Sequence, residues 1–215
     1  MSLKKITRSY LDFAHQIKDE LNNLDGKLGD GDLGNTVLNG AKAIYEVALE
    51  SDSLQTWFVE GGKAFRRAAP STMGILLASA LIKAGKKMST EQMDENSLTV
   101  KNWGTLQREM VNEIQKRGGA RIGDKTILDS LIPAVEAFEE NEDENALNAL
   151  QSAKEKAKVG AESTKGMKSK TGRSSWLGER ANEHVDGGAW LCYLTYEFLF
   201  NNLQECVDKG GEIND

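Results

Sequence analysis

The sequence is poor in the residues that break helices, cross-link chains or bind transition metals. Its 215 residues include only two prolines, two cysteines and two histidines. Because proline is the strongest helix breaker, long helices are permitted along most of the chain. Cys192 and Cys206 are 14 positions apart, and a helix between them would separate the thiols by about 21 Å, too far for a disulfide. Their spacing fits free thiols in a reducing compartment and argues against a zinc site.

Long apolar runs and excess positive charge are missing as well. No segment approaches the ~20 apolar residues that span a bilayer, and the first residues form no hydrophobic signal segment. The 33 acidic and 27 basic residues leave a net charge of −6, which argues against a nucleic-acid binder and a polybasic membrane anchor. We therefore expect a cytoplasmic protein with no nucleic-acid or membrane partner.

Apolar residues instead recur at helical spacing along the chain. The first stripe comprises Ile6, Tyr10, Phe13, Ile17, Leu21 and Leu24. Similar patterns predict helices that open near Asn35 or Thr36, Leu54, Met73 and Thr99, and further helices opened by Asp124, near Asp143 and after Gly188. Pro133 is expected to kink the sixth helix. Because no segment alternates with the period of a strand, we predict eight helices in one all-α domain over residues 1–215.

Two long polar loops, 24–34 and 164–188, are the candidate functional segments. In the first loop, Asp25, Asp30 and Asp32 are interleaved with four glycines that allow a sharp turn. Three carboxylates so close together repel one another without a cation, and oxygen ligands select Mg²⁺ or Ca²⁺. An EF-hand is excluded because Ala41 stands where its glutamate ligand belongs. The next helix would present its first N–H groups, at Gly34, Asn35 and Thr36, to a phosphate.

A plainer interpretation remains open for each loop. The first can be a solvated acidic turn, or a Ca²⁺ loop in a structural all-α protein. The second carries five cations, of which Lys170 or Arg173 could neutralise phosphate charge, while Trp176 could cover a base or simply pack. Taken alone, the second loop is interpreted as an exposed basic loop. His15 is expected at the surface, and His184, beside the second loop, is a candidate functional residue.

The segment 118–126 nearly matches a phosphate-binding P-loop. Asp124 intervenes between the second glycine and Lys125, and no strand precedes the segment. We therefore favour Asp124 as the N-cap of the sixth helix. Asp186 is likewise an N-cap, or its Gly187-Gly188 neighbours contact a sugar hydroxyl through the backbone.

Taken in order, these motifs resemble the DAK2-type nucleotide-binding domain, the L subunit of the dihydroxyacetone kinases. The matching signatures are Asp25-x4-Asp30-x-Asp32-x-Gly34, Gly123-Asp124-Lys125-Thr126-x-x-Asp129, Lys170-x-Gly172-Arg173-x-Ser175-x-Leu177-Gly178-Glu179-Arg180 and His184-x-Asp186-x-Gly188-Ala189, with a weaker match at Met73-Gly74-x-Leu76. The resemblance covers essentially the whole chain.

The resemblance implies a fold, cofactors and site residues. The fold is an up-and-down barrel of eight antiparallel helices. Asp25, Asp30 and Asp32 would hold two Mg²⁺ ions that bridge the phosphates of ADP or ATP, and Arg173 would add positive charge for phosphoryl transfer. The implied nucleotide contacts are Gly34, Asn35, Thr36, Thr72, Met73, Gly74, Gly118, Ile127, Arg173, Asp186, Gly187 and Gly188.

The resemblance also implies partners and a reaction. A phosphohistidine donor, the M-type subunit of a PEP-dependent phosphotransferase system, would phosphorylate bound ADP, and the group would pass to dihydroxyacetone or a related small ketose on a K-type subunit. In ATP-dependent relatives the same domain is fused to the K domain. The sequence leaves the donor, the acceptor and the oligomeric state open, a homodimer included.

Four positions depart from the family pattern. Leu33 replaces a common histidine, Met73 replaces a serine, Asn35 comes one position early and Gly187 stands where proline is typical. The predicted metal ligands are intact, whereas part of the nucleotide shell differs. These departures motivate two alternatives: a regulatory nucleotide-binding module without turnover, and an ATP-dependent divergent paralogue acting on another small polyol or ketose.

Overall fold

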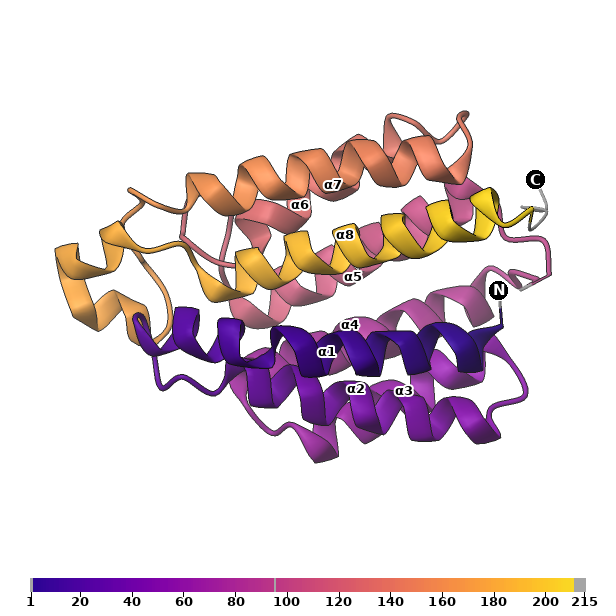
Figure 1. The fold of residues 1–215 in the computed structure, drawn as a ribbon, viewed down its shortest axis with the longest axis horizontal. Coiled ribbons are helices and arrows are strands. Elements are labelled where there is room, and N and C mark those ends of the chain that lie inside the picture. Colours follow the sequence, from indigo (N-terminus) through magenta and orange to yellow (C-terminus); the bar gives the residue numbers. More distant parts are fainter. Residues whose placement is uncertain (1, 95, 211–215) are drawn as a thin grey trace. The chain divides into compact units, whose positions relative to one another are not determined.

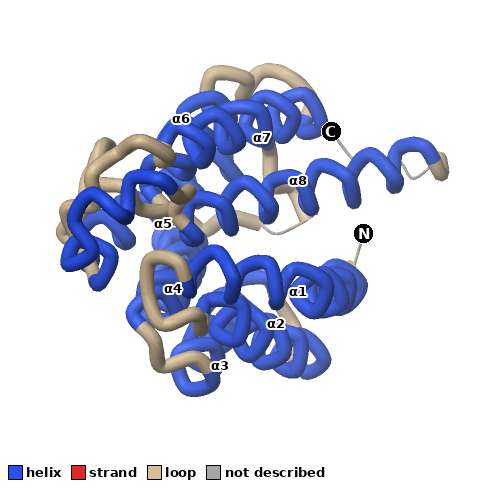
Figure 2. The backbone as a smooth tube through the Cα atoms, turned by 60° about the vertical axis from the view of Figure 1, so that its left-hand side comes forward, coloured by secondary structure: helices blue, strands red, loops and turns tan. Residues whose placement is uncertain are grey.

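The computed structural model describes residues 2–94 and 96–210, without the side chains of Arg173, Ser174, Leu177 and Arg180. These residues form eight α-helices and no strand, which confirms the predicted all-α class (Figure 2). The helices are α1 (Leu3–Gly26), α2 (Leu33–Glu50), α3 (Leu54–Ala68), α4 (Thr72–Thr90), α5 (Val100–Gly118), α6 (Leu128–Glu139), α7 (Ala146–Ser163) and α8 (Gly187–Asp208). A run of 3₁₀ turns, η1 (Arg173–Glu183), precedes α8.

The chain divides into two compact units. The first contains Met1–Asn22, Asp32–Leu98 and Thr105–Gly119, and the second contains Asn23–Gly31, Thr99–Gly104 and Ala120–Asp215. Within the first unit, α3 packs against both α2 and α4, and α1 to α4 alternate in direction along the chain (Figure 1). Buried Ile44, Phe65, Ala69 and Ala78 form an apolar core there.

Glycine permits the close helix packing of the first unit. A Cβ at Gly40 of α2 would lie 2.1 Å from the Phe65 ring, and one at Gly62 of α3 would lie 2.7 Å from the Ala78 carbonyl oxygen. Both distances are below van der Waals contact. Glycine at these positions therefore lets α2 approach the Phe65 ring, and lets α3 approach the backbone of α4, more closely than a residue with a side chain would.

In the second unit, α6, α7 and α8 pack on one another and run in alternating directions (Figure 1). The predicted alanine-rich helix is α7, which buries Ala149, Ala153, Ala157, Gly160 and Ala161 on one side. Asn145 caps its start, since the side chain accepts a hydrogen bond from the Asn148 amide. Small residues on this face bring α7 close to α6.

Helix periodicity placed the elements correctly but missed some boundaries and one buried face. The buried stripe of α1 is Thr7, Leu11, Ala14, Ile17 and Leu21. It agrees with the predicted stripe at Ile17 and Leu21 and is shifted by one position in the first half of the helix. Ile6, Tyr10 and Phe13 are only half-buried. Because the aromatic rings are large, they cover the core edge from flanking positions.

Four helix starts differ from the prediction by two residues or more. The seventh helix begins at Ala146 and not near Asp143, and the eighth begins at Gly187 and not after Gly188. The second helix begins at Leu33, ahead of Asn35, because Asp32 is its N-cap. The sixth helix begins at Leu128 and not at Asp124. Lys125 has a φ of +62°, which is incompatible with a right-handed helix through Asp124. The predicted cap at Thr99 is confirmed, since its hydroxyl accepts a hydrogen bond from the Asn102 amide at 3.2 Å.

Two further expectations concern the cysteines and the membrane. Cys192 is buried, Cys206 is half-buried, and neither forms a disulfide in the described chain. Among the described residues, no helix is both long and apolar enough to cross a membrane.

Candidate functional site

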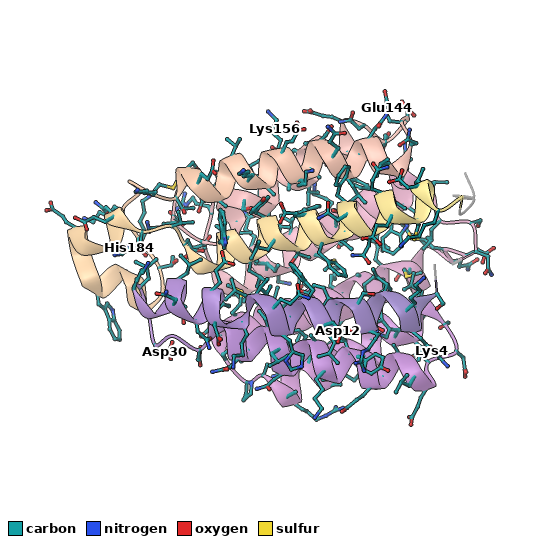
Figure 3. All side chains as sticks on the ribbon, viewed as in Figure 1. Lys4, Asp12, Asp30, Glu144, Lys156 and His184 are labelled. Atoms are coloured by element: carbon teal, nitrogen blue, oxygen red, sulfur yellow. The ribbon has the colours of Figure 1, made fainter. Side chains whose placement is uncertain are left out.

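The acidic loop between α1 and α2 brings three carboxylates together. Asp25 lies in the last turn of α1, Asp30 lies in the turn that follows (Figure 3), and Asp32 is the N-cap of α2. One carboxylate oxygen from each residue lies within 4.8 Å of those of the other two. Gly31 takes a φ of +74°, which lets the backbone turn so that the carboxylates converge.

The donor set of this loop suits a hard cation. Asp25 is half-buried, whereas Asp30 and Asp32 are exposed. Three oxygen ligands without nitrogen or sulfur favour Mg²⁺ or Ca²⁺, and they leave coordination positions for water or phosphate oxygens, as Mg²⁺ prefers. The three predicted metal ligands therefore lie close together in the structure.

The start of α2 is organised by a partner that the sequence did not reveal. Asp32 caps the helix through its backbone position, and its side chain makes no capping hydrogen bond. Asn22 of α1 accepts a hydrogen bond from the Asn35 amide at 3.2 Å. The Thr36 amide donates to the Asp32 carbonyl, so it already belongs to the helix. Of the three amides predicted to face a phosphate, those of Asn35 and Thr36 therefore already donate to acceptors within the protein.

A hydroxyl pair joins the start of α2 to the start of α4. The Thr36 and Ser71 hydroxyl oxygens are 2.9 Å apart, and Ser71 caps α4 by accepting from the Gly74 amide at 3.1 Å. Two helix N-termini therefore lie side by side, and their dipoles favour a negatively charged group. The pair brings together the predicted segments Gly34–Thr36 and Thr72–Gly74.

Gly118 lies beside the same helix start. It ends α5, and a Cβ there would contact the Leu76 side chain at 3.7 Å. Thr72 is exposed, Met73 is half-buried and Gly74 is buried. Seven predicted nucleotide contacts thus gather around the first turns of α2 and α4.

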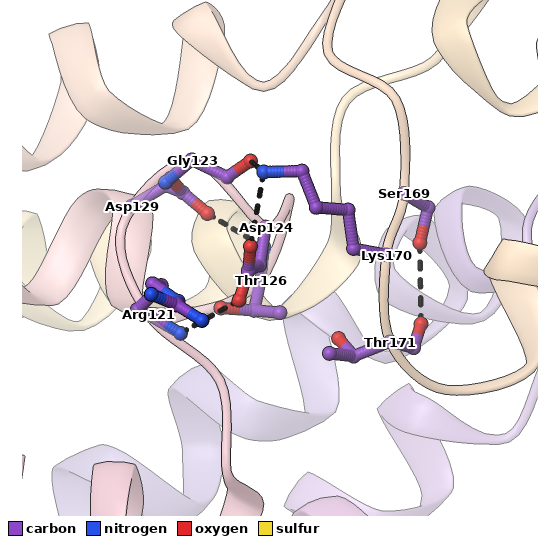
Figure 4. Close-up of polar contacts among 8 residues, drawn as sticks. All are labelled: Arg121, Gly123, Asp124, Thr126, Asp129, Ser169, Lys170 and Thr171. Atoms are coloured by element: carbon purple, nitrogen blue, oxygen red, sulfur yellow. Dashed lines mark hydrogen bonds and ion pairs between the residues drawn. The ribbon is translucent and has the colours of Figure 1, made fainter.

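The remaining candidates lie in the second unit, around the loop before α6. Lys170 donates from its ammonium to the Gly123 carbonyl at 2.9 Å and to the Asp124 carboxylate at 3.1 Å (Figure 4). The Arg121 amide also donates to Asp124 at 2.9 Å. This amide and the Lys170 ammonium hold the pKa of the Asp124 carboxyl below its usual value.

Asp129, rather than Asp124, organises the start of α6. Its carboxylate accepts from the Gly123 amide at 2.5 Å and from the Thr126 amide at 2.7 Å. The predicted N-cap role of Asp124 is therefore wrong, because its carboxylate bonds the Arg121 amide, which precedes it. Ile127, a predicted nucleotide contact, is buried at the head of the same helix.

The start of α8 follows the prediction more closely. Asp186 is its N-cap and accepts a hydrogen bond from the Ala189 amide at 2.8 Å. Burial raises the pKa of the Asp186 carboxyl to about 6. Gly187 and Gly188 are buried in the first turn, and His184 stands in the preceding turn (Figure 3). The side chain of Arg173 lies outside the described residues, and Trp176 is exposed.

Three residues with structural roles at these segments escaped the sequence analysis. Asn22 carries no signal, because a polar residue on an amphipathic helix is ordinarily solvated. Ser71 does carry one: a serine after Pro70, just before an apolar run, is a typical N-cap. Lys125 is fully buried, which no pattern of residue types predicts for a lysine.

Comparison with known proteins places this geometry in a family. The model of the DAK2 domain matches residues 27–201. A Dictyostelium discoideum protein named "Probable dihydroxyacetone kinase" is 32% identical over 191 residues, which cover 83% of this chain and 30% of that protein. The ADP-binding subunit DhaL of PEP-dependent dihydroxyacetone kinase 2 from Listeria innocua is 30% identical over 199 residues, 88% of each chain.

A solved structure shares the fold. The dihydroxyacetone kinase of C. freundii superposes with a TM-score of 0.72 and 25% identity over 93% of this chain and 34% of that one. The chain thus spans about a third of the length of the larger relatives and most of the length of the Listeria subunit. This likeness confirms the all-α, eight-helix fold that the resemblance implied. By sequence match and by fold, the chain belongs to the DAK2 domain family.

Proposed function

We propose that residues 1–215 act as one DhaL-type domain, an ADP- or ATP-binding phosphotransferase subunit that depends on Mg²⁺. The observation that carries the proposal is the convergence of the Asp25, Asp30 and Asp32 carboxylates beside a helix N-terminus. A cluster of negative charge at the positive end of a helix suits a metal-bound phosphate, since the cation binds the carboxylates and the phosphate faces the amides. The Listeria relative named as an ADP-binding subunit supports the choice of nucleotide.

The chain's own residues would bind and orient the nucleotide. The three aspartates would hold two Mg²⁺ ions, which when bound neutralise phosphate charge in phosphoryl transfer. The first turns of α2 and α4 would receive the phosphates, and Thr36 and Ser71 fix these turns against each other. Gly118, Ile127, Arg173 and Asp186–Gly188 complete the proposed nucleotide shell.

The proposed reaction is a phosphoryl relay. A phosphohistidine on an M-type subunit of a PEP-dependent system would phosphorylate bound ADP, and the nucleotide would pass the group to dihydroxyacetone or a related ketose on a K-type subunit. The name of the Listeria relative supports a PEP-dependent system. The chain needs no covalent nucleophile for this role, because positioning and charge neutralisation supply most of the catalysis.

One observation favours a second candidate, a regulatory nucleotide-binding module. Leu33 occupies a position where the family commonly has histidine, and its side chain is buried. Leu33 therefore contributes an apolar side chain to the core, and this position provides no imidazole that could contact a ligand. Turnover with a K-type subunit and a phosphoryl donor separates the two candidates, because only the phosphotransferase would lose activity with Asp30→Asn.

The decisive experiment is native mass spectrometry of the protein with and without EDTA, paired with thermal melting in ADP. We expect ADP to be retained, and ADP to raise the melting temperature only when Mg²⁺ is present. Asp30→Asn should weaken Mg²⁺-dependent ADP binding by more than the roughly 10–100-fold that loss of a second-shell partner costs a metal site.

Asp12→Asn is the matched control. Asp12 is also an exposed carboxylate, on α1, and pairs with Arg8 at 3.3 Å. Its substitution should leave ADP binding at the wild-type value. Absence of retained ADP, together with no Mg²⁺-dependent stabilisation of the wild type, would refute the proposed function.

A further inference from the structure

Lys125 is a fully buried lysine outside the proposed metal and nucleotide contacts. Its side chain is 1% exposed, and its backbone has a φ of +62°. Its ammonium donates to the carbonyl oxygen of Thr164 at 2.6 Å and to that of His184 at 2.5 Å. One cation thus ties the loop before α6 to the end of α7 and to the turn that precedes α8.

A buried lysine in this conformation lowers the free energy of unfolding, so packing alone does not explain its presence. A lysine with positive φ is strained by about 1 kcal/mol or more, and a buried ammonium loses its hydration. Burial lowers the pKa of the Lys125 ammonium, while the carboxylates of Asp186 and Asp129 act in the opposite direction. An apolar residue would fill the same volume without the desolvation cost, although it would share the strain of the positive φ.

The two carbonyls that Lys125 holds lead directly to the start of α8. Thr164, whose carbonyl accepts from Lys125, also accepts through its hydroxyl from the Asp186 amide at 2.9 Å. Asp186 in turn caps α8 through the Ala189 amide. His184, the second acceptor, is two residues before Asp186. The Lys125 ammonium is therefore linked to the backbone just before and at residue 186 through two residues, His184 and Thr164.

We propose that Lys125 is a positioning residue for the nucleotide, acting through Thr164 and His184 to hold Asp186, Gly187 and Gly188 in place. This inference rests on the proposed function, in which those three residues contact bound nucleotide. Lys125 itself touches no nucleotide in this scheme. Its removal should therefore loosen the first turn of α8 and weaken nucleotide binding, with a smaller effect on the rest of the fold.

The test measures the dissociation constant of ADP in saturating Mg²⁺, together with the melting temperature without nucleotide. Lys125→Met keeps the length of the side chain and removes the ammonium. We expect its dissociation constant to rise about 10-fold, the factor that corresponds to the net loss of one or two hydrogen bonds. The nucleotide KM should rise by the same factor, while kcat changes less.

Ser130→Ala is the matched control for a purely structural effect. The Ser130 hydroxyl is fully buried in the same unit and donates to the Ala157 carbonyl at 2.8 Å. It should lower the melting temperature and leave the ADP dissociation constant within about twofold of wild type. Equal weakening by both variants would overturn the proposal, as would wild-type affinity in Lys125→Met.

A second pair of variants covers the case in which Lys125→Met fails to fold. Thr164→Val removes the hydroxyl that accepts from the Asp186 amide, and Thr164→Ser keeps it. We expect the valine variant to bind ADP weakly and the serine variant to restore wild-type affinity. Equal affinity of the two would overturn the proposal. A wild-type protein that binds no ADP refutes the proposed function first, and this inference with it.

Discussion

Gly160 of α7 offers a sharp test of the packing between α6 and α7. A Cβ built on Gly160 would lie 2.2 Å from the Asp129 carbonyl oxygen and 2.8 Å from the Ser130 Cα. Both are backbone atoms, so no rotamer change relieves the clash. Pro133 contributes to this close approach: lacking an N–H, it cannot donate to the Asp129 carbonyl four residues earlier.

Gly160→Ala has two opposing effects on the free energy of unfolding, and their magnitudes decide whether it rises or falls. Alanine is favoured over glycine in a helix interior by about 1 kcal/mol. Overpacking a well-packed core costs about 1–3 kcal/mol, and rigid backbone on both sides puts Gly160 at the upper end of this range. We therefore expect the free energy of unfolding to fall by about 2 kcal/mol and the melting temperature to fall by about 4–8 °C.

Gly104 of α5 provides the control for helix propensity. A Cβ there would meet only side-chain atoms, Glu139 Cγ at 3.2 Å and Phe138 Cδ1 at 3.7 Å. The Glu139 side chain can move, so Gly104→Ala should leave stability unchanged or raise it by up to about 1 kcal/mol. Urea denaturation followed by circular dichroism measures both variants. A Gly160→Ala protein as stable as wild type would refute the reasoning, and so would equal destabilisation of the two.

Two further predictions concern the helix starts. Ser71→Ala removes the cap of α4 and the contact with Thr36. It should lower the free energy of unfolding by about 1–2 kcal/mol, measured by denaturation, and weaken ADP binding, measured by calorimetry. An unchanged ADP affinity would show that Ser71 does not support the nucleotide site. Burial raises the pKa of Asp186 to about 6 from an ordinary value of 3.8, so the folded state binds this proton more tightly than the unfolded state, and stability from this group rises as pH falls from 7 to 5. Asp186→Asn keeps a capping side chain that does not titrate, so it gains no such stability, and its free energy of unfolding should fall relative to that of the wild type as the pH is lowered from 7 to 5. A difference between the two proteins that does not change with pH would contradict the assignment.

The helices were predictable because each carries its own apolar period. The alanines of α7 specify its buried face from local sequence alone. The stripe from Ile6 to Leu24 predicts the helix α1, but only its second half matches the buried face. Helix starts were less predictable where two neighbouring residues are both plausible caps. Asp129 bonds the Gly123 and Thr126 amides and moves the start of α6 to Leu128. The sequence near Asp124 contains an equally plausible cap, and only the fold selects between the two.

In the candidate site, contacts within one loop could be predicted from the sequence, whereas contacts between residues far apart in the sequence could not. The acidic loop was predictable because its three carboxylates lie within eight residues, so a turn is enough to bring them together. The contact between Thr36 and Ser71 joins positions 35 residues apart, and Lys125 reaches acceptors 39 and 59 residues away. Single-sequence reasoning has no measure of such distances, because they depend on how the helices pack.

The glycines and the aspartates of the family motifs carry different weight as indicators of function. A Cβ at Gly34 would lie 1.9 Å from the Lys18 carbonyl oxygen, and one at Gly74 would lie 2.0 Å from that of Ala69. Helix packing alone therefore requires glycine at both positions, whether or not a nucleotide binds. Asp30 and Asp32 are exposed, so packing does not require a carboxylate at either. A chain that kept the fold but lost the activity would be expected to retain Gly34 and Gly74 and to lose the aspartates. Because this chain keeps all three aspartates within 4.8 Å of one another, the acidic loop supports metal-dependent chemistry more strongly than the glycine pattern does.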